Sequence, residues 1–130
     1  MKKLKRAFIS YSTDASTKAG QVSKHLAKLG VESFIFEKDL SEDSGGHHAR
    51  IRSEIEKSDA VILILSVKSK NSSWVSHELG IASGMNKMII VFRTAHNMKL
   101  PDYLDGYQVS ILQTIDDLDK RFGLKLKRNS

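Results

Sequence analysis

Trp74 and Glu78, four residues apart, form the pair of side chains in this sequence best suited to ligand chemistry. On a helix this spacing places both side chains on one face, about one turn apart. The indole offers a flat surface for stacking, and the carboxylate can accept hydroxyl hydrogen bonds or face a developing positive charge. The pair therefore suits a cationic or sugar-like ligand. The alternative is that Trp74 belongs to the core and Glu78 is a solvated helix residue.

The segment around this pair has the pattern of a polar loop that leads into a helix. It reads LSVKSKNSSWVSHELG over residues 65–80 and begins where a strongly apolar run ends. Ser72 and Ser73 can cap the N-terminus of the helix, and Gly84 marks its expected end. The spacing thus predicts that Trp74 and Glu78 are presented together near the start of a helix.

Strand and helix patterns alternate along the rest of the sequence. Strands are predicted over residues 7–12, 31–36, 60–65, 88–92 and 108–112. Helices are predicted over residues 15–29, around residues 51–58, from Trp74 to about Gly84, and over residues 115–122. Gly30 ends the first helix, and Thr114 with Asp117 caps the last one. The polar segment 37–46, EKDLSEDSGG, is predicted to be a loop in which Gly45 and Gly46 form a hinge.

This alternation predicts a parallel sheet with helices on both faces. Five strands in so short a chain indicate an α/β flavodoxin-like, three-layer fold with strand order 2-1-3-4-5. In such sheets, ligands bind beyond the carboxyl ends of the strands, here between the first and third strands. Residues 11–14, 37–46 and 66–74 reach that point. The fold and the Trp74–Glu78 pair therefore indicate the same place, which favours a ligand-binding role for the pair.

Composition restricts the remaining possibilities. A chain of 130 residues with 40% hydrophobic content is expected to form one domain, with an ordered core over about 5–123. It contains no cysteine, which excludes disulfides and thiol chemistry. Nine of its 21 basic residues lie in the first six and last eleven positions, and the other 12 are outnumbered by 15 acidic residues. The net charge of +6 thus belongs to basic tails and does not predict specific nucleic-acid binding.

Several other functions of this fold lack their residues here. The sequence has no GxGxxG fingerprint, no Walker phosphate loop and no GxSxG nucleophile motif. The end of the predicted third strand, Leu65-Ser66, lacks the phosphoacceptor aspartate of a response-regulator receiver. His47 and His48 have no third ligand at metal spacing, so no metal site is expected. With no apolar run long enough to span a membrane and no signal-peptide core, we expect a cytoplasmic protein that does not bind membranes.

With these motifs in view, the sequence resembles the Toll/interleukin receptor (TIR) domain family over nearly its whole length. AFISYS, residues 7–12, resembles the first-strand box of the family, and residues 36–46 correspond to its BB loop. Residues 65–80 are similar to the LS…S.W…EL segment, which is the most specific match. The resemblance implies a single TIR domain over residues 1–130.

In the enzymatic branch of this family, the resemblance implies cleavage of the bond between nicotinamide and ribose in NAD⁺, which is a substrate and not a cofactor. The catalytic glutamate of the Trp-x-x-x-Glu segment matches Glu78. The positions that bind the dinucleotide match Trp74, Tyr11, Ser12 and Thr13, together with Leu40 and an acidic BB-loop residue, either Glu37 or Asp39. Some members carry arginines where this chain has Ser12 and Thr13. Because nicotinamide leaves as a neutral molecule, the chemistry needs stabilisation of an oxocarbenium-like ribosyl centre rather than a general acid.

The resemblance also implies how such a protein acts. It is similar to prokaryotic immune TIR proteins of the Thoeris kind, which signal to a separate effector protein through a nucleotide product. The product is ADP-ribose, a cyclic ADP-ribose or a conjugate, and the sequence leaves this choice open. Family precedent further predicts homo-oligomers formed through the loop from Glu37 to Gly46. The alternative function is a non-catalytic module for protein–protein interaction.

Overall fold

The strands and helices alternate along the chain as the sequence predicts. The computed structural model describes residues 4–37, 44–70, 73–95 and 98–122. Its elements are β1 (Arg6–Tyr11), η1 (Thr13–Ala15), α1 (Ser16–Lys28), β2 (Glu32–Glu37), α2 (Ser44–Lys57), β3 (Ala60–Leu65), α3 (Val67–Lys70), α4 (Ser73–Gly84), β4 (Met88–Arg93), η2 (Asp102–Leu104), β5 (Val109–Leu112) and α5 (Ile115–Phe122). Of the nine basic residues assigned to the tails, five lie outside the described residues, whereas Arg6 belongs to β1 and Lys120 and Arg121 belong to α5.

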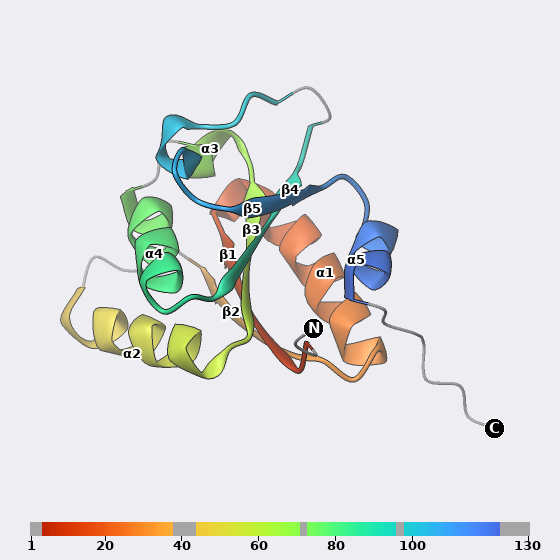
Figure 1. Cartoon of the computed structure of the whole chain (residues 1–130), viewed down its shortest axis with the longest axis horizontal. Coiled ribbons are helices and arrows are strands. Elements are labelled where there is room, and N and C mark those ends of the chain that lie inside the picture. The colour runs from red at the N-terminus through yellow and green to blue at the C-terminus, as the bar shows by residue number, and fades with distance from the viewer. Residues whose placement is uncertain (1–3, 38–43, 71–72, 96–97, 123–130) are drawn as a thin grey trace.

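The five strands form one sheet in the order β2-β1-β3-β4-β5, with every neighbouring pair parallel. This order confirms the predicted flavodoxin-like α/β fold. All six residues of β3 are buried, as its uninterrupted apolar sequence predicts for a central strand covered on both faces. Because the strands are parallel, their carboxyl ends lie along one edge of the sheet, and those of β1, β3 and β4 point toward α3 at the top of Figure 1.

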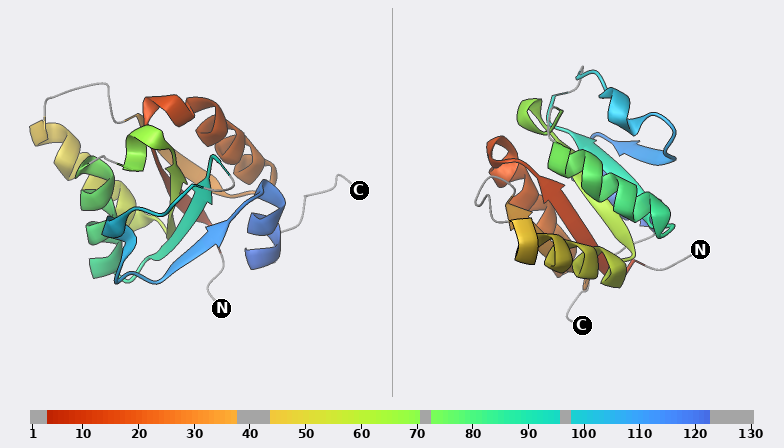
Figure 2. Two further views of the ribbon diagram at one scale, coloured as in Figure 1. Left: turned by 90° about the horizontal axis from the view of Figure 1, so that it is seen from above. Right: turned by 90° about the vertical axis from the view of Figure 1, so that its left-hand side faces the viewer.

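Helices cover both faces of the sheet, which therefore lies between two apolar layers (Figures 1 and 2). One layer packs the buried residues of α1 and Leu118 of α5 against alternate strand residues such as Ile62 and Ile90. The other packs residues of α2 and α4 against the intervening strand residues, such as Leu63 and Val91. This period of two sorts the side chains of every strand between the two layers.

The end of α1 follows from one glycine. Gly30 has a positive φ of 82°, a left-handed backbone conformation that glycine adopts with little strain. Its N–H donates to the carbonyl of Ala27, and the N–H of Val31 returns to the carbonyl of Leu26. These bonds satisfy carbonyl groups that the helix leaves open at its end. The predicted stop at Gly30 is therefore confirmed.

Two elements differ from the sequence prediction. Helix α2 begins at Ser44, so Gly45 and Gly46 lie in its first turn, and their predicted place in a loop hinge is wrong. A short helix, α3, occupies residues 67–70, where a continuous loop was predicted. The sequence did not predict these helical residues because neither segment has apolar residues at helical spacing. Helix α2 opens on Ser-Gly-Gly-His-His, and α3 reads Val-Lys-Ser-Lys. Within the described residues, no helix is long and apolar enough to cross a membrane.

Candidate active site

Helix α4 directs a carboxylate into the protein interior. Val75, Leu79 and Ala82 form the core face of α4, and Glu78 lies on the same face by the spacing of three and four residues. The Glu78 side chain is fully buried, with 0% exposure. The alternative that Glu78 is a solvated helix residue is therefore wrong. A buried carboxylate is costly unless hydrogen bonds compensate its lost hydration, so its surroundings are informative.

The hydrogen-bond donor next to this carboxylate comes from β1. Ser10 Oγ donates to Glu78 Oε1 over 2.8 Å, and Ser10 is also fully buried. Phe8, two residues earlier on β1, packs in the α2–α4 layer, whereas Ile9 and Tyr11 pack in the layer of α1. The alternation of the strand thus places Ser10, and not Tyr11, beside Glu78. Ser10 pairs in register with Leu63 of β3, so the contact lies near the carboxyl ends of β1 and β3.

The other buried glutamate offers a useful contrast. Glu54, 6% exposed, forms ion pairs with Arg6 and Arg50 at the amino end of β1. Desolvation by burial is the largest single influence and acts to raise the pKa of Glu54, but the hydrogen bond and charge of Arg6, together with the charges of Lys57 and Arg50, lower it below its ordinary value. Arginine neutralises Glu54, as expected for a structural ion pair. Glu78 instead accepts a hydrogen bond from a neutral hydroxyl at the edge of the sheet where ligands of this fold bind.

Hydrogen bonds join the segments that follow β1 and β3. Asp14 of η1 accepts from Ser66 Oγ at 2.7 Å and from the backbone N–H of Lys68 at 3.1 Å. Lys68 Nζ donates to Thr13 Oγ1 at 2.9 Å. These bonds connect η1 to the beginning of α3 across the switch point between the two strands. They confirm that residues 11–14 and the start of 66–74 meet there.

A tyrosine from the segment between β4 and β5 also contacts this region. The hydroxyl of Tyr103, in η2, donates to the carbonyl of Ser69 over 2.7 Å. Burial raises the pKa of Tyr103 to about 12, so the phenol stays protonated and remains a donor at neutral pH. Ser69 Oγ in turn accepts from the backbone N–H of Ser66 at 2.7 Å. The rim after β3 is therefore held by a network of hydroxyl groups.

The predicted binding residues after β1 lie at this rim in different surroundings. Tyr11 packs in the α1 layer and is 7% exposed. Ser12 is buried and precedes η1, where its carbonyl accepts from the N–H of Ala15. Thr13 contacts Lys68. The donor in the hydrogen bond to Glu78 described above is thus Ser10, and not one of these three predicted residues.

The other predicted binding positions lie wholly or partly outside the described residues. Asp39 and Leu40 fall in the segment 38–43. Glu37 ends β2 and Trp74 belongs to the first turn of α4, but only their backbones are described. Their assignment to dinucleotide binding stays a prediction.

Ser10 is the site residue that sequence reasoning missed. Its signal was present, because a small polar side chain directly follows the apolar run Ala7-Phe8-Ile9 within the same strand. The alternation of β1 assigns that side chain to the face of Phe8. What the sequence could not supply is the position of α4 over that face.

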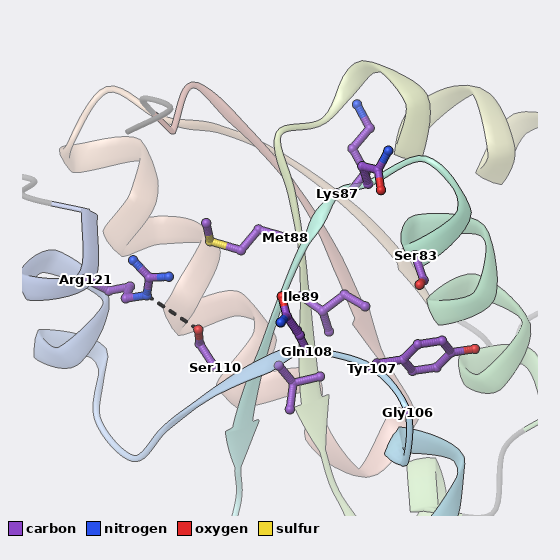
Figure 3. Close-up of a pocket in the computed structure, with 11 residues that line it drawn as sticks. Ser83, Lys87, Met88, Ile89, Gly106, Tyr107, Gln108, Ser110 and Arg121 are labelled. Carbon is purple, nitrogen blue, oxygen red and sulfur yellow. Dashed lines mark hydrogen bonds between the residues drawn. The ribbon is translucent and has the colours of Figure 1, made fainter.

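A separate cavity lies at the opposite edge of the sheet. It measures about 760 Å³ and is bordered by the starts of β4 and β5 with Ser83, Lys87, Tyr107 and Arg121 among its lining residues (Figure 3). Arg121 Nε donates to Ser110 Oγ across it at 3.4 Å. Met88 and Val109 open their strands here, at the amino edge, whereas Glu78 meets β1 near its carboxyl end. This cavity is therefore distinct from the candidate active site.

The geometry around Glu78 suits stabilisation of positive charge. A carboxylate has about four lone-pair positions, and one of those of Glu78 accepts the hydrogen bond from Ser10. Low polarity around a buried charge strengthens its attraction to a cation that develops nearby. No group of three metal-ligating side chains occurs in the described part of the chain.

The sequence was compared with known protein families and its structure with solved structures. A family model described as "TIR domain" matches residues 7–125. No curated protein sequence matches the chain. Among solved structures, the chain is similar to the TIR domain of the Toll-related receptor TRR-2 from Hydra magnipapillata, with 19% identity and a TM-score of 0.61 over 88% of this chain and 87% of that one.

Two enzymes also share the fold. A 2-desoxiribosyltransferase from Leishmania mexicana is 18% identical, with a TM-score of 0.61 over 91% of this chain and 96% of that one. A CMP N-glycosidase from Clostridium botulinum is 18% identical, with a TM-score of 0.55 over 92% and 98%. At these identities the likeness is one of fold.

Proposed function

The chain belongs to the TIR domain family, and we propose that it is an enzyme that cleaves the bond between nicotinamide and ribose in NAD⁺. The observation that carries this proposal is the buried Glu78 carboxylate, which accepts a hydrogen bond from Ser10 near the carboxyl ends of β1 and β3. The fold itself supports the proposal, because two enzymes that share it are named for deoxyribosyl transfer and for N-glycoside cleavage.

The proposed reaction needs one charged group and a shaped pocket. The C1′–N bond breaks and its electron pair goes to the pyridinium ring, so nicotinamide leaves neutral and the ribosyl carbon becomes cationic. Glu78 in its ionised form stabilises that cation and accepts hydrogen bonds from the ribose hydroxyls. Ser10 fixes the orientation of the carboxylate. Water then bonds to C1′ and releases a proton, which gives ADP-ribose.

The nucleophile determines the product. An internal hydroxyl or ring nitrogen of the same dinucleotide in place of water gives a cyclic ADP-ribose, and a second molecule gives a conjugate. In the proposed role, this product is a nucleotide signal in prokaryotic immunity that a separate effector protein detects. NAD⁺ is the substrate, and the cytoplasm is where the protein would meet it.

The decisive experiment is incubation of the purified chain with NAD⁺, followed by chromatography of the products. We expect release of nicotinamide together with a ribosyl product, and loss of both with Glu78→Gln. The assay is best run with dilute and with concentrated protein, because activity in this family can depend on assembly. No nicotinamide release at either concentration would contradict the proposal and favour the interaction module instead.

A further inference from the structure

A cavity with cationic walls lies on the face of the sheet opposite Glu78. It measures about 510 Å³ and lies between the start of α1 and the residues at the ends of β4 and β5. This volume falls within the range of roughly 300–1,000 Å³ typical of small-molecule sites. Every residue that lines it except Ala15 has a polar side chain. The cavity is therefore suited to a polar ligand.

Two basic side chains reach this cavity from different elements. Lys18 comes from the first turns of α1 and Arg93 from the end of β4. Lys18 Nζ lies 5.9 Å from the ring centroid of Phe92, a contact that leaves its ammonium hydrogens available for an anion. Across the described ranges, neither cation has a carboxylate within ion-pair distance. Two like charges beside one cavity favour an anion between them.

The guanidinium of Arg93 is already oriented. Its Nη1 donates to the carbonyl of Met98 at 3.3 Å. With the amide oxygen of Gln113 turned toward it, its Nε and Nη2 donate to that oxygen as well. A guanidinium has five N–H donors, so these bonds hold its plane and still leave donors for a ligand.

The carboxylates near the cavity are engaged with backbone and hydroxyl donors. Asp14 lines the cavity, but its two oxygens accept from Ser66 and Lys68 on the side of β3. Asp117 accepts from the backbone N–H groups of Gln113 and Thr114 at 3.2 and 3.1 Å. Neither carboxylate is paired with Lys18 or Arg93. Two cations, Lys18 and Arg93, face one lining carboxylate, Asp14, so the residues that line the cavity carry a net positive charge.

We propose that this cavity binds the phosphate of a small phosphorylated ligand, with Lys18 and Arg93 as its charged contacts. The hydroxyls of Thr17, Thr94 and Thr114 line the same space and supply neutral donors. The site is separate from Glu78 and does not depend on the proposed NAD⁺ cleavage. It adjoins the candidate active site through η1, whose Thr13 and Asp14 contact the segment after β3.

The test is calorimetric titration of the intact chain with pyrophosphate at about physiological salt, where weak surface attraction is screened. We expect saturable binding that is at least tenfold weaker in Lys18→Gln/Arg93→Gln. The matched control is Lys28→Gln/Arg52→Gln, which removes the same charge from exposed positions of α1 and α2. Lys18→Gln alone, with its melting temperature compared, covers the case in which loss of Arg93 disturbs folding. Absence of saturable binding, or equal loss in the control, would overturn the proposal.

A second titration identifies the source of the phosphate. The Glu78→Gln variant is saturated with pyrophosphate and then titrated with NAD⁺ or with ribose 5-phosphate. Displacement by NAD⁺ would assign the site to the diphosphate of a dinucleotide. Displacement by ribose 5-phosphate alone would assign it to a separate phosphomonoester. If neither displaces pyrophosphate, the assignment to small phosphorylated metabolites is wrong.

Discussion

Removing a carboxylate from water costs several kcal/mol unless new hydrogen bonds compensate it. Glu78 bears this cost in a core where an apolar side chain of similar size would pack well. Ser10 supplies one compensating hydrogen bond. Ionisable side chains buried in this way are concentrated at functional sites.

Glu78→Gln should abolish most NAD⁺ cleavage. The substitution keeps the size and hydrogen-bonding shape of the side chain but removes the charge that faces the ribosyl cation, so we expect a loss of about 100-fold or more. The rate of nicotinamide release measures it. Glu56→Gln, an exposed change of the same kind on α2, is the matched control. Unchanged turnover in Glu78→Gln at an unchanged melting temperature would remove Glu78 from the mechanism.

Ser10→Ala should lower turnover by acting through Glu78. It deletes a donor to a buried acceptor, which costs about 1–3 kcal/mol of stability, and it removes one hydrogen bond that orients the carboxylate. We expect kcat to fall about tenfold with a smaller change in KM. In a Glu78→Gln background the same substitution should have little further effect on turnover. Additive losses in that double-mutant cycle would show that Ser10 does not act through Glu78.

At the scale of single elements, the sequence predicts helices and strands whose apolar residues recur at regular spacing, and it misses those without such a pattern. The uninterrupted apolar run of β3 and the regularly spaced apolar residues of α1 predicted both elements with nearly their observed bounds, and Gly30 predicted the end of α1. The start of α2 has neither signal, and its two glycines have low helix propensity, so tertiary context decided it. For the site, Glu78 followed from spacing, whereas its bond to Ser10 required the packing of α4 on β1.

Gly20→Ala should stabilise the protein. Gly20 lies in α1, and a methyl group there would meet no atom within 4 Å. Alanine favours the helix over glycine by roughly 0.5–1 kcal/mol, so chemical denaturation should give an increase of about that size. Gly106→Ala has equally open space but a φ of +89°, and it should destabilise. Equal effects at the two positions would contradict this account.

The N-terminal cap of α5 should make the stability of that helix sensitive to acid. Hydrogen bonds from the backbone N–H groups of Thr114 and Gln113 lower the pKa of Asp117. A pKa that is lower in the folded state adds stability above the unfolded value of about 3.9, and this is lost as the pH falls through the folded value. Asp117→Asn should therefore lower the melting temperature at pH 7 and flatten its decline below about pH 4. A parallel decline in both proteins would argue against the cap.

At the scale of the whole molecule, the candidate active site combines segments next to two neighbouring strands, β1 and β3. The described contacts come from η1, β1, α3 and α4. The segment from Glu37 to Gly46, which follows β2 in the sequence, contains four acidic residues: Glu37, Asp39, Glu42 and Asp43. We predict that this charged segment contacts a ligand or a second copy of the chain.

We predict that specific activity rises with protein concentration. A head-to-tail contact through the 37–46 segment would complete the dinucleotide site with residues of a neighbouring subunit, and such contacts build open assemblies. Asp39→Ala with Leu40→Ala should lower activity several-fold at high concentration and leave the melting temperature unchanged. Rates of nicotinamide release across a hundredfold range of protein concentration measure it. A flat profile with an unaffected variant would mean that the monomer is fully active.

The alternation of β1 makes the carboxylate contact sensitive to chain length. Ser10 faces Glu78 because it shares a face with Phe8, while Ile9 and Tyr11 face the other layer. With the start of β1 held in register, deleting one codon between Arg6 and Ser10 would move Tyr11 to the position of Ser10, and inserting one codon there would move Ile9 to it. Single-residue insertions and deletions in β1 should therefore be selected against more strongly than most substitutions there, even where hydrophobicity is preserved. In a library of β1 variants scored for activity, length changes should be the rarest survivors.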